Sequence, residues 1–359
     1  MTVEKRHENA VNVLIVDDSQ VAREFLTHIF SEAGIRVIGA VPDGREAIRF
    51  VQQRRPDVIT MDIYMAGMNG LEATRRIMET IPVPIVIVSG NWEPAEVDTT
   101  FRAMEAGALA VVQRPYGAGH PGHEGSVQEL VRTVRLMSEV RVVRRWSRTG
   151  PDKPAESSVS PEAGSKVQGN VKLVAVGASA GGPPVLQRIF GGLSVDFPVP
   201  VLVVQHMAAG FLPGMLNWLG ESSAMRLRIA CDGETVLPGN AYFAPDGFHM
   251  GVSGDKTVFL SSAGPEHGAR PSISYLFRSV GKAYGGAAAA VLLTGMGRDG
   301  AAEMRQLREK GALTIAQDRE SSAVYGMPEA AVQLGAASLV LSPGQITDTL
   351  NRLAKRTIS

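Results

Sequence analysis

Cysteine is almost missing from this sequence, because Cys231 is the only one among 359 residues. A single cysteine excludes a disulfide within the chain and is typical of proteins in a reducing compartment. A free cysteine usually behaves as a small hydrophobic side chain. We therefore expect Cys231 to be a half-buried core residue.

Net charge and long apolar runs are missing as well. The 36 basic and 36 acidic residues give a formal net charge of zero, so no global field favours nucleic acid or anionic membranes. Apolar runs such as residues 287–293 fall well short of the ~20 residues that span a bilayer. Residues 1–10 carry charges where a signal peptide needs an apolar segment. We expect a soluble, cytoplasmic protein that does not bind nucleic acid and has no segment inserted into a membrane.

What the sequence does contain is two blocks of short β-branched runs alternating with helical patterns, which predicts parallel α/β sheets. The length also favours two domains. Between the blocks, residues 147–170 are rich in Pro, Ser, Gly, Glu and Lys, a composition too polar to offset its ordering entropy. We predict two doubly wound parallel-sheet domains, at 11–140 and 170–357, joined by a flexible linker at 141–169.

The strand predictions follow from the apolar runs. In the first domain the expected strands are residues 12–16, 36–40, 58–61, 85–88 and 110–112. In the second domain they are residues 172–176, 200–204, 241–244, 288–293 and 312–316. The helix after the first strand is expected to bury one face made of Val21, Phe25, Leu26, Ile29 and Phe30.

Three carboxylates follow strands of the first domain. Asp17 and Asp18 come after its first strand and Asp62 after its third. Because the carboxyl ends of parallel strands face one crevice, these groups repel one another unless a cation lies among them, and oxygen ligands suit Mg²⁺. Ser89 follows the fourth strand and can donate to a bound phosphoryl oxygen. Helix-capping aspartates explain one or two of these residues, but they explain the four together poorly.

These residues resemble the receiver domain of two-component response regulators, which has a flavodoxin-like fold. The resemblance covers residues 11–140 and rests on the segments 13–19 (VLIVDDS), 61–63 (MDI), 68–71 (MNGL) and 88–90 (VSG). It implies that Asp62 accepts a phosphoryl group from a histidine kinase of the CheA type. It also implies that Asp17, Asp18 and Asp62 hold Mg²⁺.

The sequence departs from the receiver pattern at the switch. Arg114-Pro115 stands where receivers carry Lys-Pro, and Val111 stands where an aromatic residue is usual. Arginine keeps the charge, but its planar group is not equivalent to an ammonium. Tyr64 and Ala66 also replace an acidic residue and a proline. Phosphorylation of Asp62 is expected, with Ser89 and Arg114 as the switch residues, whereas normal activation is left open.

A glycine turn marks the start of the second domain. An apolar run ends at Gly177, and Gly177-x-Ser179-x-Gly181 leads into Pro183-Pro184 and a helical pattern. The sequence therefore predicts strand, tight turn and helix, with the Ser179 hydroxyl beside a helix N-terminus where negative charge is stabilised. On the motif alone, a phosphate or dinucleotide cradle is favoured over a nucleophile. The turn lacks both the G-x-G-x-x-G spacing and the lysine of a P-loop.

A serine nucleophile needs a general base that is itself oriented by a third group. His206 follows the next apolar run, and Asp299 lies after the run at 288–293. His249 and His267 are rival bases that spacing does not exclude, and Asp299 has an alternative role as a helix cap. The order serine, histidine, acid differs from that of α/β-hydrolases, so the motif does not indicate a lipase of that fold.

Six motifs in order resemble the catalytic domain of CheB-type protein-glutamate methylesterases of bacterial chemotaxis. They are residues 177–182 (GASAGG), 205–207 (QHM), 244–245 (AP) with Gly247 and His249, 270–272 (RPS) with 276–279 (LFRS), 293–297 (LTGMG) with 299–300 (DG), and 316–318 (AQD) with 326–328 (GMP). The resemblance implies a Rossmann-like α/β domain and a serine hydrolase that releases methanol from glutamate γ-methyl esters of chemoreceptors, without a cofactor. Deamidation of receptor glutamines by the same route is also implied.

The resemblance assigns a role to each residue. Ser179 is the nucleophile, His206 the base and Asp299 the orienting acid, and the N–H groups of Ala180 and Met296 stabilise the oxyanion. Phosphorylation of Asp62 regulates the enzyme. Two alternatives stay open: a phosphorylation-gated adaptor that binds chemoreceptors without catalysis, and a receiver fused to a nucleotide-binding α/β domain. The sequence does not identify the receptors, the kinase, the pathway output or the oligomeric state.

Overall fold

The computed structural model describes residues 10–90, 94–140, 142 and 171–357. The chain divides into two compact units, Met1–Ser147 and Arg148–Ser359, and each is described by itself. Apart from residue 142, the predicted linker at 141–169 lies outside the described residues, so its flexibility stays a prediction.

The first unit is a parallel five-stranded sheet in the order β2-β1-β3-β4-β5. Its strands are β1 (Asn12–Val16), β2 (Arg36–Val41), β3 (Val58–Met61), β4 (Ile85–Ser89) and β5 (Ala110–Gln113). Its helices are α1 (Gln20–Glu32), α2 (Gly44–Gln53), α3 (Gly70–Thr80), α4 (Pro94–Glu105) and α5 (His123–Ser138). Helices α1 and α5 contact each other, and α3 contacts both α2 and α4. This strand order is that of the flavodoxin-like fold, as predicted.

Ser19 caps the N-terminus of helix α1, and its hydroxyl accepts a hydrogen bond from the Ala22 backbone N–H. Its buried face contains Leu26, Ile29 and Phe30, as predicted. The prediction for Val21 was wrong, because 76% of that residue is exposed. Its neighbour Ala22 is buried, so Val21 lies outside the edge of the buried face, and apolar spacing alone does not show how wide that face is.

The second unit is a parallel seven-stranded sheet in the order β14-β13-β12-β6-β7-β9-β8. Its strands are β6 (Leu173–Ala178), β7 (Val201–Gln205), β8 (Arg226–Ile229), β9 (Asn240–Phe243), β12 (Ala288–Leu292), β13 (Leu313–Gln317) and β14 (Leu339–Leu341). Separately, β10 (His249–Val252) and β11 (Val258–Ser261) form an antiparallel hairpin. The sheet confirms the predicted parallel α/β architecture.

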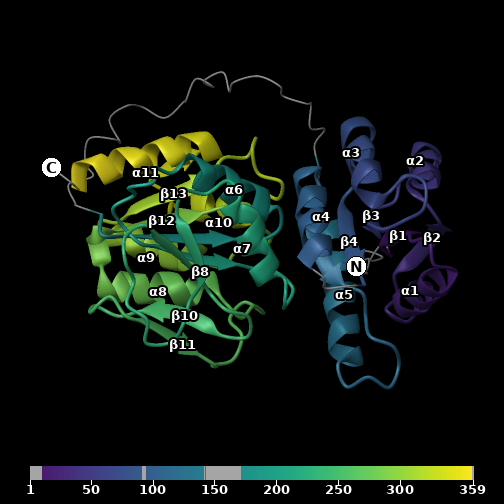
Figure 1. The fold of residues 1–359 in the computed structure, drawn as a ribbon, viewed down its shortest axis with the longest axis horizontal. Helices are drawn as coiled ribbons and strands as arrows, with labels where there is room; N and C mark the ends of the chain where they lie inside the picture. The colour runs from purple at the N-terminus through teal and green to yellow at the C-terminus, as the bar shows by residue number, and fades with distance from the viewer. Residues whose placement is uncertain (1–9, 91–93, 141, 143–170, 358–359) are drawn as a thin grey trace, which may run out of the picture. The chain divides into compact units, whose positions relative to one another are not determined.

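Helices cover both faces of this sheet. They are α6 (Gly182–Gly192), α7 (Leu212–Gly220), α8 (Ile273–Ala283), α9 (Ala301–Glu309), α10 (Met327–Gln333) and α11 (Pro343–Thr357), with a 3₁₀ turn, η2, at Gly285–Ala287. Helices α6 and α11 lie together on one face, and α8 and α9 on the other, with the hairpin beyond α8 (Figure 1).

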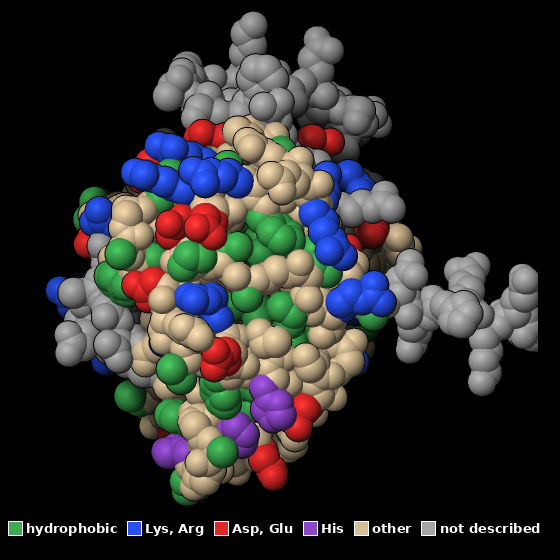
Figure 2. Space-filling view, turned by 90° about the vertical axis from the view of Figure 1, so that its right-hand side faces the viewer, with side chains coloured by type: hydrophobic (Ala, Val, Ile, Leu, Met, Phe, Trp, Pro, Cys, Tyr) green, Lys and Arg blue, Asp and Glu red, His purple; other side chains and the backbone are tan. Residues whose placement is uncertain are grey.

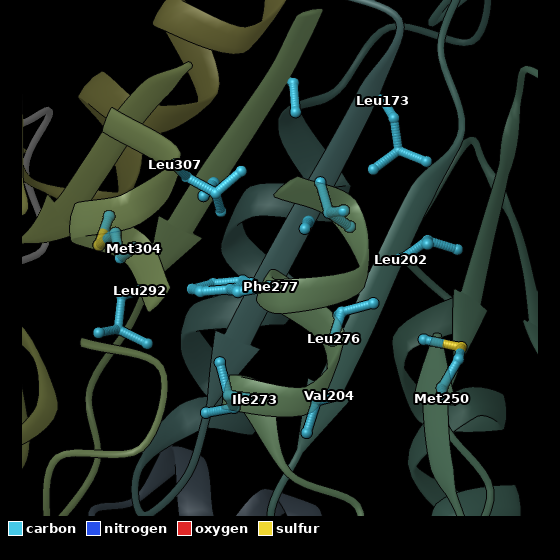
Figure 3. Close-up of a cluster of buried hydrophobic side chains, with 14 of the residues drawn as sticks. Leu173, Leu202, Val204, Met250, Ile273, Leu276, Phe277, Leu292, Met304 and Leu307 are labelled. Carbon is cyan, nitrogen blue, oxygen red and sulfur yellow. The ribbon is translucent and has the colours of Figure 1, made fainter. Parts of the chain in front are cut away.

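The core of the second unit lies under α8 and α9. Figure 3 shows α8 side chains pointing toward those of the sheet, with α9 and hairpin side chains beside them, among them Leu173, Leu202, Val204, Met250, Ile273, Leu276, Phe277, Leu292, Met304 and Leu307. Burying side chains of this size contributes about 1.5–3 kcal/mol each. The packing fixes the N-terminus of α8 against the sheet, which matters for the site described below.

The single cysteine lies at the surface. The prediction for Cys231 was wrong: it is exposed, because it lies just beyond the short strand β8 and before a turn.

Charges of both signs are interspersed on the side shown in Figure 2, with apolar patches between them. Among the described residues, no helix combines the length and apolarity needed to cross a membrane.

Candidate active site and acidic cluster

Ser179 lies in the turn between β6 and α6. Its N–H donates to the Thr294 carbonyl oxygen at 3.0 Å, and its carbonyl oxygen accepts from the Gly182 N–H at 2.8 Å. Gly181 has φ +71°, in the left-handed region that side chains rarely adopt. The turn therefore needs glycine at 181 to pass from strand to helix within three residues. Ser179 itself is half-buried.

The helix after the turn is a poor phosphate cradle. Pro183 and Pro184 fill its first turn, and proline has no N–H to offer an anion. Phosphate sites at helix N-termini depend on those N–H groups. The structure thus disfavours the nucleotide-binding alternative at this turn.

His206 and Asp299 meet beside this turn. His206 follows β7 directly, and its N–H donates to the Ala178 carbonyl oxygen at 2.9 Å, one residue before Ser179. The His206 Nε2 lies 3.0 Å from Asp299 Oδ2. Because the carboxylate facing Nε2 can only accept a hydrogen bond, we assign the proton to Nε2. The His206 Nδ1 is then left with a lone pair that can take a proton.

Asp299 is almost fully buried and is held by the N-terminus of α8. Its Oδ1 accepts from Ser272 Oγ and from the Ser274 N–H, each at 2.9 Å. Its Oδ2 accepts from the Ile273 N–H at 2.8 Å. Burial alone opposes ionisation, but hydrogen bonds from His206 and Ser274 outweigh it and hold the pKa of Asp299 below its usual range. Asp299 is therefore a carboxylate aimed at the imidazole.

The loop after β12 lies directly against the serine. A Cβ added at Gly295 would come within 2.5 Å of the Ser179 Cβ, so only glycine permits this approach. The loop is fixed by the Thr294 hydroxyl, which donates to the Ala180 carbonyl oxygen at 3.0 Å. In the described part of the chain, neither the Ala180 N–H nor the Met296 N–H donates a hydrogen bond. Both predicted oxyanion donors are thus available beside the turn.

The two rival bases differ in their surroundings from His206. His249 is completely buried, with Nδ1 accepting from the Ser272 N–H at 3.1 Å and Nε2 lying 3.0 Å from the Gly264 carbonyl oxygen. Both ring nitrogens of His249 make hydrogen bonds, so His249 has no free lone pair that could accept the proton of a serine. His267 is exposed in the turn between Glu266 and Ala269.

Several residues that build the site carry no catalytic role in the sequence analysis. Ser272 caps α8 and, with Ser274, binds Asp299. A serine before an apolar helical pattern can be recognised as an N-cap, but the sequence pattern does not show that Ser272 binds Asp299. Gln205 donates to the Ser179 carbonyl oxygen at 2.9 Å and Gln317 accepts from the Thr294 N–H at 2.8 Å. Only the folded arrangement shows these supports.

In the first unit, Asp17, Asp18 and Asp62 form the acidic cluster. Each offers a carboxylate oxygen, and these oxygens lie within 4.8 Å of one another. Arg114 Nη2 donates to Asp17 Oδ2 at 2.6 Å and to Asp62 Oδ2 at 3.2 Å. Ser89 is buried at the end of β4, and its carbonyl oxygen accepts from the Arg114 N–H at 2.7 Å. The structure thus brings the predicted receiver residues to one edge of the sheet.

The acidic cluster is electrostatically crowded. Burial and the neighbouring Asp17 raise the pKa of Asp62 to about 6, although Arg114 acts in the opposite direction. Burial likewise raises the pKa of Asp17. A divalent cation would relieve this repulsion, and an all-oxygen donor set is the one that Mg²⁺ prefers. The residues therefore fit Mg²⁺. Val111 is half-buried on β5 and Tyr64 is 45% exposed.

Comparisons with known proteins agree with both units. The family model of the response regulator receiver domain matches residues 13–120, and that of CheB methylesterase matches residues 174–350. A protein-glutamate methylesterase/protein-glutamine glutaminase of Nitrosospira multiformis is 54% identical over 96% of this chain and 97% of its own. One of Geobacter metallireducens is 54% identical over 96% of this chain and 99% of its own.

A solved structure also matches the second unit. The Thermotoga maritima CheB methylesterase catalytic domain superposes with a TM-score of 0.50 at 35% identity, covering 51% of this chain and 98% of that one.

Proposed function

The chain belongs to the CheB methylesterase family, and on that basis we propose how its own residues carry out the reaction. It hydrolyses glutamate γ-methyl esters of bacterial chemoreceptors and deamidates glutamines by the same route, because only the leaving group changes. The observation that carries the assignment is the His206 Nε2 to Asp299 Oδ2 contact of 3.0 Å beside Ser179.

The reaction begins at Ser179. As its oxygen bonds to the ester carbonyl carbon, its proton passes to Nδ1 of His206, while Asp299 fixes the tautomer and stabilises the imidazolium. The Ala180 and Met296 N–H groups face the oxyanion, and one such donor is worth about 3 kcal/mol. When the intermediate collapses, the methoxy oxygen takes the proton from Nδ1 and leaves as methanol. The esterase reaction needs no cofactor.

Hydrolysis of the glutamyl-enzyme reverses these roles. His206 takes a proton from water, the water oxygen bonds to the acyl carbon, and Ser179 leaves with the proton returned from Nδ1. The product is a glutamate carboxylate, and the serine is regenerated. For a glutamine substrate the leaving group is ammonia instead of methanol.

The test is methanol release from methylated chemoreceptors by Ser179→Ala. We expect a loss of at least about 10³-fold, because the nucleophile acts as a unit with its base. Ser222→Ala, at an exposed serine in the turn after α7, is the matched control and should retain the wild-type rate. Release by Ser179→Ala at the wild-type rate would refute the assignment.

The receiver is proposed to regulate this activity through Asp62. An Asp62 oxygen attacks the phosphorus of a phosphohistidine on a CheA-type kinase, and the histidine nitrogen leaves. Asp17, Asp18 and Asp62 would hold Mg²⁺, which neutralises phosphoryl charge when bound. Ser89 and Arg114 lie where they can contact the phosphoryl oxygens. The protein would work in the cytoplasm, where the proposed kinase and the modified glutamates of the receptors are available to it.

Regulation is tested separately from catalysis. The methylesterase rate is measured with a small-molecule phosphodonor and Mg²⁺, for the wild type and for Asp62→Asn. We expect a rate increase that Asp62→Asn abolishes. An unchanged wild-type rate would refute regulation and leave the esterase assignment intact.

A further inference from the structure

A second histidine lies behind the proposed triad. His249 opens β10, is completely buried, and takes no part in the reaction described above. Its Nε2 lies 3.0 Å from the Gly264 carbonyl oxygen, and its Nδ1 accepts from the Ser272 N–H at 3.1 Å. Since a carbonyl oxygen only accepts, the proton is on Nε2, and Nδ1 is the acceptor for Ser272.

Ser272 leads directly to the catalytic acid. Asp299 accepts from the Ser272 hydroxyl and from the next two backbone N–H groups, at 2.8–2.9 Å. Among the described residues, the carboxylate accepts hydrogen bonds from residues 272–274 and otherwise contacts His206. The position of this short segment sets the direction of the carboxylate, and with it the orientation of the imidazole.

The histidine is well suited to hold that segment. Its ring stacks on Tyr275 of α8, with ring centroids 4.7 Å apart and planes 12° from parallel. His249 therefore contacts the start of α8 at two points: it accepts a hydrogen bond from the Ser272 N–H, and its ring stacks on Tyr275. A neutral imidazole with both nitrogens engaged is a rigid connection between the hairpin and the helix.

We propose that His249 is a positioning residue for the methylesterase reaction, which holds the Ser272–Ser274 segment so that Asp299 stays aligned with His206. The inference rests on the proposed function. Its effect is on the chemical step, because His249 is buried and touches no substrate. A misplacement of about 1 Å in such an arrangement costs on the order of 100-fold in rate.

The test uses three full-length variants and a receptor cytoplasmic fragment that carries labelled glutamate γ-methyl esters. His249→Phe keeps the stacking ring but removes both hydrogen bonds, and His249→Asn retains an acceptor near the Nδ1 position. We expect His249→Phe to lower kcat by about 10- to 100-fold with KM unchanged, and His249→Asn to recover part of the loss. Phe259→Leu is the matched control, because Phe259 packs on the other hairpin strand against Tyr275 without joining the hydrogen-bonded chain.

A double-mutant comparison separates positioning from general destabilisation. His249→Phe is combined with Asp299→Ala, and residual turnover is measured per folded enzyme, with folding checked by near-ultraviolet circular dichroism. If His249 acts through Asp299, the second substitution has no further effect. The low-field proton resonance of His206 Nε2–H on Asp299 should also disappear in His249→Phe. If the Phe variant does not fold, the same comparisons are made with His249→Asn.

The outcomes distinguish the inference from the proposed function. If Asp299→Ala turns over at the wild-type rate, the triad assignment fails. If Asp299→Ala is impaired while His249→Phe keeps the wild-type kcat, only the positioning role fails. An equal loss from His249→Phe in both backgrounds, or an equal loss in Phe259→Leu, would also overturn it in favour of a purely structural role.

Discussion

Replacing Asp299 by asparagine tests the hydrogen-bond pattern of the proposed triad most sharply. The substitution keeps the shape of the side chain but turns one acceptor into a donor. Each carboxylate oxygen of Asp299 faces a backbone N–H: Ser274 at Oδ1 and Ile273 at Oδ2. Whichever way the amide turns, its NH₂ group therefore opposes one backbone N–H.

The two amide orientations have different chemical consequences. With the amide oxygen at the Oδ1 position, the NH₂ group donates to His206 Nε2 and forces the proton onto Nδ1, where Ser179 needs a base. With the oxygen at the Oδ2 position, the tautomer is correct but the negative charge that stabilises the imidazolium is lost. Neither orientation restores both the tautomer and the charge.

We expect kcat for methanol release to fall by about 10³- to 10⁴-fold, as for the loss of the acid from a serine triad. That factor corresponds to about 4–5.5 kcal/mol of transition-state stabilisation. One unsatisfied buried N–H lowers the free energy of unfolding by about 1–3 kcal/mol, which urea unfolding measures. Asp255→Asn, in an exposed turn, is the control and should change kcat little. An Asp299→Asn enzyme within about tenfold of the wild-type kcat would refute the reasoning.

Three further predictions concern other parts of the molecule. Arg114→Lys replaces a planar guanidinium that contacts two carboxylates at once by a compact ammonium. We therefore expect several-fold tighter Mg²⁺ binding, measured by fluorescence titration, and faster phosphorylation, measured by phosphate incorporation. Equal values for the wild type and the variant would contradict this prediction. Gly295→Ala places a Cβ 2.5 Å from the Ser179 Cβ, which costs about 1–3 kcal/mol and should lower kcat at least tenfold, whereas Gly264→Ala enters open space and should not. Folding lowers the pKa of Asp299, so the ionised carboxylate stabilises the folded protein fully above the unfolded pKa of about 3.9, and this stabilisation is lost as the pH falls through the folded pKa. The free energy of unfolding of the wild type, measured by urea titration, should therefore drop more steeply below about pH 5 than that of Asp299→Asn. Parallel curves for the two proteins would contradict the pKa shift.

Much of the fold could be predicted from the sequence, because short apolar runs that alternate with helical patterns leave few alternatives. Every predicted strand range agrees with an observed strand to within two residues at each end. Strands β8, β10, β11 and β14, which have three or four residues each, were not predicted. Length alone is not the reason, because β3, β5 and β9 also have four residues each and were predicted. In β8 two arginines and mostly exposed positions also conceal a strand at the sheet edge.

The candidate site could be predicted only in part. Ser179 and His206 each follow a strand directly, so their place at the carboxyl edge follows from the strand predictions. The choice between His206 and His249 could not be made from spacing, because it depends on which nitrogens are already engaged. The hydrogen bonds from Ser272 and Ser274 to Asp299 could not be predicted either, because they join a helix N-terminus to a loop more than 20 residues further along the chain.

What brings the three catalytic candidates together is the strand order rather than any local motif. Strand β6 pairs with β12 on one side and with β7 on the other, so the residues after these three strands meet at adjacent positions of one edge. The serine follows the central strand, and its base and orienting acid come from the two neighbours. A sheet in sequential order would instead separate Asp299 from Ser179 by several strand widths of about 4.8 Å each. The crossover that places β12 beside β6 is therefore as necessary to the proposed chemistry as the side chains, and changes that weaken this pairing should impair catalysis before they unfold the domain.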